Sequence, residues 1–452
     1  MGRKRFYISG LSRLLAAYPQ PVYVLDANRV VVYCNTACLD WTRATVDEIV
    51  GRRCDYHSHN SDDGTPNLLG GLCPPPEVFQ GRPITTTVAC ADPDGHWIDR
   101  PAECLPLADS QGGCQGVIVF ICADDLARIS PSPSHVPPPE ELHRQLRNLI
   151  FKSDASNQVS QIIGQSPAMR RVAQQVKFAT GGDARVLISG PPGSGREMIA
   201  RAVHYGGAAS SSPLMPLACN LLDSELFDST IAAFAASCVE LNNERPAALL
   251  LLEVDQLPSD AQASLAKMLT KGELNLRTIA TARTPLIELA RRNEYRSDLA
   301  FALSTLAIQP PPLAERIEDV PLLAQHFLEQ ENARGGKQLT GFSEETLDAL
   351  VAYPWPENVD ELRKLILQSC AAATGPLVQI TDLPERIGVT AAANAHPAAE
   401  DPSIKLDEYL AEIERELLVR SVQWAKGNKA QAARLLGISR ARLLRRLGHF
   451  GI

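Results

Sequence analysis

The feature that most constrains the fold is a short apolar run followed directly by a glycine-rich loop. Residues 186–189 are typical of a buried strand, and residues 190–197 carry three glycines. Ile199, Ala200 and Val203 then have the spacing of the inner face of a helix. A strand, a glycine-rich turn and a helix in this order present backbone amides and a helix N-terminus to phosphate groups. The segment therefore predicts an α/β domain with a phosphate site.

This loop looks like a P-loop, which makes it a candidate nucleotide site with ATP as the candidate ligand. The predicted contacts are Gly190, Gly193, Ser194, Gly195, Arg196 and Glu197. A backbone cradle for phosphate depends on glycines, and these are present. The alternative is a tight strand-to-helix turn that binds no ligand, and the sequence leaves both interpretations open.

The length of the chain and two low-complexity segments divide it into three units. Its 452 residues are too many for one ordinary hydrophobic core. Residues 130–139 and 388–402 are rich in Pro, Ser and Ala and read as linkers. The predicted units are residues 1–125, 161–387 and 403–452, joined by linkers at 126–160 and 388–402. Residues 140–151 have helical spacing, which fits a signalling helix and a plain spacer helix equally.

Composition excludes some classes of protein. Apolar residues make up 45% of the chain, yet the longest apolar runs, residues 117–123 and 247–252, are far shorter than a membrane span. The basic N-terminus is not followed by a signal-peptide core, so we expect a cytoplasmic protein without membrane contact. The 11 cysteines are then expected to be mostly free thiols.

The C-terminal end is strongly basic although the whole chain has a net charge of −8. From Lys426 onward there are seven Lys or Arg and no acid. Residues 429–436 form a predicted helix, Gly437 a left-handed turn, and Ser439 the N-cap of a last helix. In that last helix, the side chains expected to face the core are Leu443, Leu444 and Leu447. The predicted DNA contacts are Lys429, Arg434, Ser439, Arg440, Arg442, Arg445 and Arg446.

These residues and the helix before them resemble a Fis-type helix-turn-helix. The apolar positions of that preceding helix are Leu406, Leu410, Ile413, Leu417 and Trp424, with Asp401 or Ser403 as its cap. The resemblance implies an all-α domain in which the long helix pairs two subunits and the last helix binds double-stranded DNA. The alternative is a basic helical hairpin on a solvated surface.

The central unit resembles the AAA+ domain of sigma-54-dependent enhancer-binding activators. The segments that carry this resemblance are residues 163–169, 224–227, 257–258, 271–273, 295–299, 311–316 and 353–359. The resemblance implies a P-loop α/β domain with a helical lid, ATP as cofactor, assembly into a ring or a hetero-oligomer, and a contact with RNA polymerase that the sequence leaves open.

The N-terminal unit resembles a PAS sensor domain, which implies an α+β fold. Residues 21–26, 30–35 and 51–52 carry the resemblance, and further strands are expected at 84–89 and 116–122. The sensor's ligand is not indicated. Eight of the 11 cysteines lie in this unit. A thiol or metal sensor around Cys54, His57, His59 and Cys73 is one hypothesis, but without a Cys-x-x-Cys motif we assign no metal ligands and favour cysteines packed as small hydrophobic residues.

The central unit departs from the family pattern at positions that carry chemistry. Arg196 stands at the P-loop lysine and keeps its charge but not its compact ammonium. Residues 232–237 replace the Gly-Ala-Phe-Thr-Gly-Ala loop that engages sigma-54, and their alanines favour a helix. Leu252 replaces the magnesium-holding Asp of the Walker B strand, while Glu253, which would orient the attacking water, is kept.

Three further departures concern the residues that sense the nucleotide or reach it from a neighbouring subunit. Ala282 stands at the sensor asparagine, and Asp360 stands at the second sensor arginine, where an acid would repel a γ-phosphate. Ala302 replaces one of two trans-acting arginines, and Arg296 remains. Glu253 and Arg296 are therefore the predicted remnants of a catalytic set.

The sequence as a whole predicts a multidomain α/β transcriptional regulator. The leading hypothesis is a sigma-54-independent regulator, in which a sensor acts through a largely silent AAA+ scaffold on a dimeric DNA-binding module. The alternative is an active ATP-hydrolysing sigma-54 activator. A third interpretation is a subunit that mixes into the ring of an active homologue, which the retained Arg296 permits.

Overall fold

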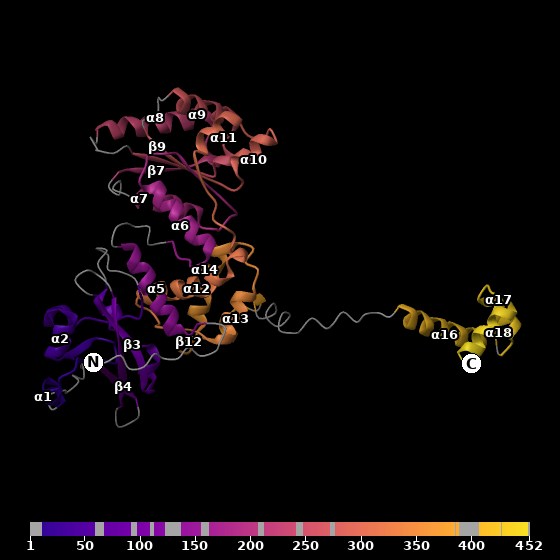
Figure 1. The fold of residues 1–452 in the computed structure, drawn as a ribbon, viewed down its shortest axis with the longest axis horizontal. Helices are drawn as coiled ribbons and strands as arrows, with labels where there is room; N and C mark the ends of the chain where they lie inside the picture. The colour runs from indigo at the N-terminus through magenta and orange to yellow at the C-terminus, as the bar shows by residue number, and fades with distance from the viewer. Residues whose placement is uncertain are drawn as a thin grey trace, which may run out of the picture. The chain divides into compact units, whose positions relative to one another are not determined.

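The computed structural model describes two compact units, residues 1–391 and 392–452, which are treated separately (Figure 1). The described residues are 11–58, 67–91, 97–108, 113–122, 137–154, 162–206, 212–240, 247–271, 276–384, 386–387, 406–425 and 427–450. Within these ranges, no helix has both the length and the apolar character needed to cross a membrane.

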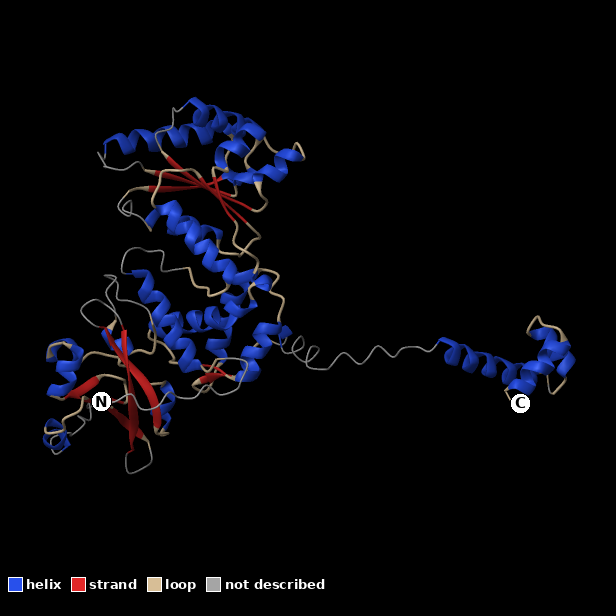
Figure 2. Cartoon of the chain, viewed as in Figure 1, coloured by secondary structure: helices blue, strands red, loops and turns tan. Residues whose placement is uncertain are grey.

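The sensor domain is a five-stranded antiparallel sheet with short helices (Figure 2). Its strands are β1 (Val22–Asp26), β2 (Val31–Cys34), β3 (Ile84–Ala91), β4 (Trp97–Ala108) and β5 (Cys114–Ile121), in the spatial order β2-β1-β5-β4-β3. Its helices are α1 (Leu11–Ala16), α2 (Thr36–Thr42), α3 (Val46–Ile49), α4 (Leu68–Gly71) and the 3-10 turn η1 (Pro76–Gln80). Buried Asn35 joins two of these elements, because its Oδ1 accepts hydrogen bonds from Cys38 N at 2.9 Å and from Val22 N at 3.0 Å.

Strand β4 is the strand of this domain that the sequence did not predict. It lies between β5 and β3 and contains Pro101 and Pro106. Proline removes a backbone donor and normally argues against an inner strand. The expected α+β sensor fold is confirmed, with one additional inner strand.

Helix α5 (Pro139–Asp154) follows the sensor domain and covers the predicted helix at residues 140–151. It packs against helix α12 (Val320–Ala333) of the domain that follows. Buried Leu142 and Leu146 of α5 belong to the same apolar core as Leu328 of α12. This helix is therefore a structural part of the AAA+ lid.

The central domain contains a parallel five-stranded sheet with helices on both faces (Figure 1). Its strands are β6 (Val186–Ser189), β7 (Leu214–Ala218), β8 (Ala248–Leu252), β9 (Arg277–Ala282) and β10 (Leu306–Ile308), in the order β10-β6-β9-β8-β7. Its helices are α6 (Pro167–Thr180), α7 (Arg196–Tyr205), α8 (Ser224–Glu240), α9 (Ser259–Lys271), α10 (Leu286–Arg291) and α11 (Ser297–Leu303).

Strand β8 shows why this sheet is buried on both faces. Leu249 and Leu251 pack on one face with Phe227, whereas Leu250 packs on the other face with Ile279 of β9. A continuous run of apolar residues is what a parallel strand covered on both sides requires. The α/β core predicted from residues 186–203 is confirmed.

The lid follows the sheet and is mostly helical. Its elements are α12, α13 (Glu344–Ala352), α14 (Asn358–Ala372) and the short parallel pair β11 (Gly341–Phe342) and β12 (Leu377–Val378). Trp355 is buried in its core and donates a hydrogen bond from Nε1 to Leu350 O at 2.9 Å. The expected helical lid is therefore present.

The C-terminal unit consists of α16 (Leu406–Trp424), α17 (Lys429–Leu435) and α18 (Arg440–His449). Gly437 has a φ of 67°, and Ser439 Oγ accepts a hydrogen bond from Arg442 N, as the sequence predicts for the turn and the N-cap. The expected inward position of Leu444 is wrong, because its side chain is 43% exposed while Leu443 and Leu447 are buried. The caps proposed at residues 401 and 403 lie outside the described residues.

We predict that the two-sided burial of β8 dominates the stability of the central domain. Leu250→Ala should lower its free energy of unfolding by about 2–5 kcal/mol, because it removes packing and leaves a cavity. The matched control is Leu226→Ala, whose side chain is 50% exposed, with a change within about 0.5 kcal/mol. Denaturant unfolding followed by circular dichroism measures both variants, and equal losses would contradict the prediction.

Candidate nucleotide site and DNA-binding helix

The predicted phosphate loop lies between the end of β6 and the start of α7. Gly193 and Gly195 have φ values of 73° and 93°, which favour glycine. A Cβ added at Gly193 would lie 2.1 Å from the carbonyl oxygen of Glu357 in the lid. Glycine is therefore required at residue 193 for two reasons, its backbone conformation and the close approach of the lid.

Three lid and hinge groups hold the carbonyl oxygens of this loop. Val359 N donates to Gly193 O at 3.0 Å, and Asn358 Nδ2 donates to Pro192 O at 2.9 Å. Arg316, which is buried, donates from Nη2 to Ser194 O at 3.2 Å. The lid thus fixes the loop through its acceptors, as a loop that offers its amides to an anion would need.

Two buried polar atoms of the loop favour a phosphate-bearing ligand. Ser194 Oγ and Arg196 Nη1 have no hydrogen-bond partner among the described residues. Buried donors without a partner are costly, and a phosphate oxygen would satisfy both. The glycine turn and these donors therefore fit a nucleotide phosphate.

Glu253, the predicted carboxylate of the Walker B strand, is engaged by arginines. Glu253 follows β8, and both its oxygens accept from Arg283, with Nε at 3.0 Å and Nη2 at 2.9 Å. Arg196 Nη2 lies 3.7 Å from the same carboxylate. The sequence analysis did not predict Arg283 as a partner of Glu253. Glu253 directly follows β8 and Arg283 directly follows β9, so the parallel pairing of these two strands could have indicated the contact.

An acid stands beside the phosphate loop from the lid side. The Cβ position of Gly193 is 3.4 Å from Cβ of Asp360, in the first turn of α14. Burial lowers the pKa of Arg196 from its usual value, whereas the carboxylates of Glu253 and Asp360 act in the opposite direction. The guanidinium of Arg196 is therefore surrounded by carboxylates of its own chain.

The other replaced positions carry no polar chemistry. Leu252 ends β8 and packs in the apolar core with Ile279 and Leu250, and Ala282 is buried at the end of β9. Ala302 packs half-buried against the core from α11. Each side chain supplies methyl groups where a catalytic site would use a carboxylate, an amide or a guanidinium.

Arg296, the predicted remnant of the trans-acting pair, is exposed at the N-terminus of α11. Its Nε and Nη2 bind the two carboxylate oxygens of Asp298 at 3.1 and 2.7 Å. The hydrogen bonds and the opposite charge of Asp298 raise the pKa of Arg296. The guanidinium of Arg296 is therefore paired with a carboxylate two residues further along the chain, and it remains exposed to solvent.

The segment that replaces the sigma-54 loop is helical, as its alanines predict. Residues 232–237 lie inside the continuous helix α8. Ser237 Oγ donates to Phe234 O at 2.8 Å within the same helix. The segment therefore has the regular backbone of a helix.

The predicted DNA-binding side chains lie on α17 and α18. Lys429 and Arg434 of α17 are exposed, and so are Arg440, Arg442 and Arg445 of α18. Arg446 differs from these residues, because its Nη1 forms an ion pair with Glu414 of α16. The structure thus leaves three guanidinium groups of α18 exposed and ties the fourth to the preceding helix.

Five of the sensor's eight cysteines are buried, and the other three are partly exposed. Cys54 and Cys73 are buried, and burial raises the pKa of both, while it raises the pKa of Cys38 and Cys104 to about 12. Thiols with raised pKa values are poor nucleophiles at neutral pH. No group of three metal-ligating side chains occurs among the described residues, and His59 of the proposed cluster lies outside them.

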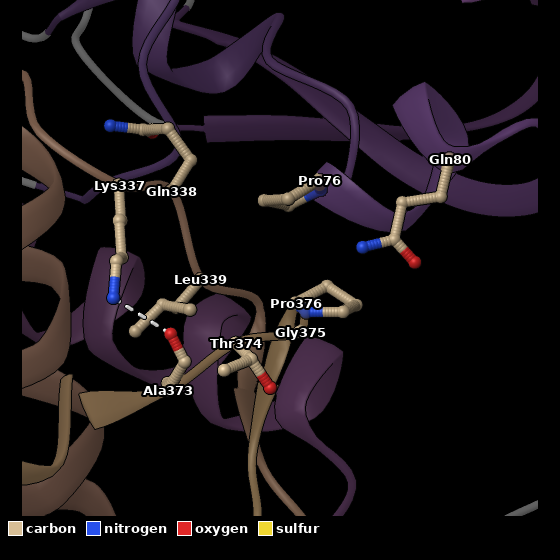
Figure 3. A pocket seen from close by; sticks show the side chains of 9 residues that line it. All are labelled: Pro76, Gln80, Lys337, Gln338, Leu339, Ala373, Thr374, Gly375 and Pro376. Carbon is tan, nitrogen blue, oxygen red and sulfur yellow. Dashed lines mark hydrogen bonds between the residues drawn. The ribbon is translucent and has the colours of Figure 1, made fainter. Parts of the chain in front are cut away.

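A cavity of about 440 Å³ opens where the sensor meets the lid (Figure 3). Its lining consists of Pro76, Gln80, Lys337, Gln338, Leu339, Ala373, Thr374, Gly375 and Pro376. Figure 3 shows Lys337 turned toward the carbonyl oxygen of Ala373, to which its Nζ donates at 2.7 Å. The cavity marks an intramolecular boundary between the two domains.

Four protein families match successive parts of the chain. The PAS fold matches residues 15–122, and the sigma-54 interaction domain matches residues 163–313. The AAA+ ATPase lid domain matches residues 314–400, and the Fis family of bacterial regulatory proteins matches residues 409–450. The order of these matches follows the order predicted from the sequence.

Curated relatives match about two thirds of the chain. The transcriptional regulatory protein ZraR of Salmonella typhimurium is 32% identical over 306 residues, covering 63% of this chain and 68% of ZraR. The DNA-binding transcriptional regulator NtrC of Azospirillum brasilense is 32% identical over 330 residues, with the same coverage. The crystal structure of Brucella abortus NtrX in complex with ATP is 25% identical, covers 65% of this chain and 70% of its own, and has a TM-score of 0.45.

The four domain matches and the 68% of ZraR that the chain covers agree with the glycine-rich loop, the helical lid and the basic C-terminal helices. The chain belongs to the family of sigma-54 enhancer-binding transcriptional regulators, and it consists of a PAS sensor, an AAA+ domain with its lid and a Fis-type helix-turn-helix.

Proposed function

We propose that this chain regulates transcription by occupying specific DNA sites, and that its AAA+ domain is a scaffold that does not hydrolyse ATP. The observation that carries this proposal is the pairing of Glu253 with Arg283, with Arg196 close by. A carboxylate that orients an attacking water must be free to accept from that water. Here two guanidinium groups of the same chain compete for it.

The predicted magnesium site lacks a metal-holding carboxylate. Magnesium is held through oxygen ligands and water, and Leu252 offers a hydrocarbon side chain at the position of the metal-holding carboxylate. Loss of one preorganised charged or hydrogen-bonding group typically lowers turnover by about 10²- to 10³-fold. With Leu252, Ala282 and Asp360 present together, turnover is expected to fall to background.

Nucleotide binding is a separate part of the proposal. The turn at Gly193 and Gly195 and the buried donors Ser194 Oγ and Arg196 Nη1 support a site that binds the phosphates of ATP. The negative charge of Asp360 opposes the γ-phosphate in particular. We therefore expect ADP to bind at least as tightly as ATP.

The DNA-binding unit is proposed to act as a homodimer. On α16, Leu417 is 52% exposed and Trp424 is 81% exposed. Large apolar side chains exposed along one helix are typical of an interface. A second copy that covers this helix would place two α18 helices on successive major grooves of double-stranded DNA.

A second candidate function is a subunit that mixes into the ring of an active homologue. Its support is the exposed guanidinium of Arg296, together with Phe301 exposed on the same helix. In such a ring, Arg296 would act on the nucleotide of a neighbouring subunit. Co-purification with an AAA+ homologue from the native cell tests this candidate directly.

We predict that ATP hydrolysis by the purified full-length chain equals that of its Glu253→Gln variant. Both should remain at the background rate in a steady-state phosphate-release assay with Mg²⁺, because Glu253 is already engaged by Arg283. Isothermal titration with ATP and ADP, done on the same samples, reports binding separately. ATP hydrolysis by the wild-type chain that is lost in Glu253→Gln would show an active ATPase and contradict the proposal.

We predict that Arg442→Ala and Arg445→Ala each weaken specific DNA binding by about 1–3 kcal/mol. For a guanidinium that contacts a phosphate, the dependence of log K on log salt should fall by about 0.9. Arg415→Ala, on exposed α16, has the same change of charge and is the matched control. Titrations against sites selected from genomic DNA measure this, and equal losses in all three variants would indicate a general charge effect instead.

A further inference from the structure

The sensor domain inserts a short loop into the AAA+ lid. Tyr56 N donates to Gln338 Oε1 at 2.8 Å, and Asn332 Nδ2 donates to Tyr56 O at 2.8 Å. Ser58 N donates to Glu329 Oε2 at 2.8 Å. Three backbone groups of the sensor thus find their partners on lid side chains. We call this contact, residues 56–58 with these lid side chains, the sensor–lid junction.

Glu329 is the centre of the junction. It is buried in α12, and its Oε1 lies 2.8 Å from His143 Nδ1 of α5 and accepts from Gln325 Nε2 at 3.0 Å. Burial alone would raise the pKa of Glu329, but His143 and the hydrogen bonds from His143, Ser58 and Gln325 outweigh it and lower the pKa to about 2. The carboxylate is therefore charged, buried and dependent on three elements for its partners.

Helix α5 reinforces the same junction from its side. The ring of Tyr56 stacks on that of His143, with centroids 4.3 Å apart. Further along α5, buried Arg147 forms an ion pair with Asp99 of β4 and lies over the ring of Trp97. The sensor therefore contacts both helices that form this face of the lid.

The opposite end of the lid holds the phosphate loop. Val359 and Asn358, at the start of α14, donate to the carbonyl oxygens of Gly193 and Pro192. Helices α12 and α14 share one apolar core, which includes Leu328 and Leu362. Because a close-packed core moves as a body, a shift of α12 at Glu329 carries α14 with it.

We propose that the sensor domain regulates the phosphate loop through the lid, with the junction at Glu329 as the point of control. A sensor state that withdraws residues 56–58 leaves the Glu329 carboxylate short of a donor inside the protein, which is unfavourable. The lid then relaxes toward another position, and its hold on Gly193 weakens. This inference goes beyond DNA binding and does not depend on whether the chain hydrolyses ATP.

The test is amide hydrogen exchange on the full-length chain carrying Glu329→Gln, which keeps the shape and removes the charge. We expect exchange to become about tenfold faster in residues 53–58 and in residues 190–197, the change that corresponds to the loss of a hydrogen bond to a charged group. Helix α13, inside the lid core, should keep its wild-type rate. Faster exchange there as well would mean general loosening and would overturn the proposal.

Two further variants make the result decisive. Glu331→Gln is the matched control on the same helix, because Glu331 pairs with Arg334 away from the junction, and it should leave both segments at wild-type rates. Gln338→Ala removes the acceptor for Tyr56 N, together with the hydrogen bond from Gln338 Nε2 to Asn332 O, and leaves Glu329 intact. It should accelerate both segments in the same direction if Glu329→Gln fails to fold. Acceleration of residues 53–58 with an unchanged phosphate loop overturns the coupling, and so does no change in either segment.

Discussion

The approach of the lid to the phosphate loop is the contact on which the AAA+ domain depends. The carbonyl oxygen of Glu357 lies where a side chain at Gly193 would be, and Val359 N donates to Gly193 O. This contact needs glycine at that position and the left-handed turn that glycine permits. It also fixes the first turn of α14, so that Asp360 stands beside the loop. The contact between the lid and Gly193 thus sets both the shape of the loop and the position of the Asp360 carboxylate beside it.

Binding the phosphates of ATP and hydrolysing ATP require different groups around that loop. Holding phosphate needs backbone amides and a positive side chain, and the loop has glycines and Arg196. Hydrolysis needs a free carboxylate, a bound metal and a guanidinium that responds to the γ-phosphate. Glu253 is instead paired with Arg283, and Leu252 has no oxygen. This arrangement supports the proposal that the domain acts as a scaffold and does not hydrolyse ATP.

Sequence reasoning succeeded where the determinant is local. The strand at residues 186–189, the left-handed turn at Gly437 and the cap at Ser439 each follow from a few neighbouring residues. It failed at β4, because the two prolines of this inner strand argue against a strand. It also failed at Arg283, because its partner Glu253 follows the adjacent strand. The sensor–lid junction joins residues more than 270 positions apart, such as Ser58 and Glu329, and no local pattern announces such a contact.

The central claim is that DNA occupancy, and not ATP turnover, is the output of this chain. The most direct measurement compares transcript levels of genes beside its bound sites in cells that carry the wild-type chain, Glu253→Gln or Arg442→Ala, with occupancy mapped in the same cells. The account predicts that Glu253→Gln preserves regulation and that Arg442→Ala abolishes both occupancy and regulation. Loss of regulation in Glu253→Gln with occupancy intact would contradict it.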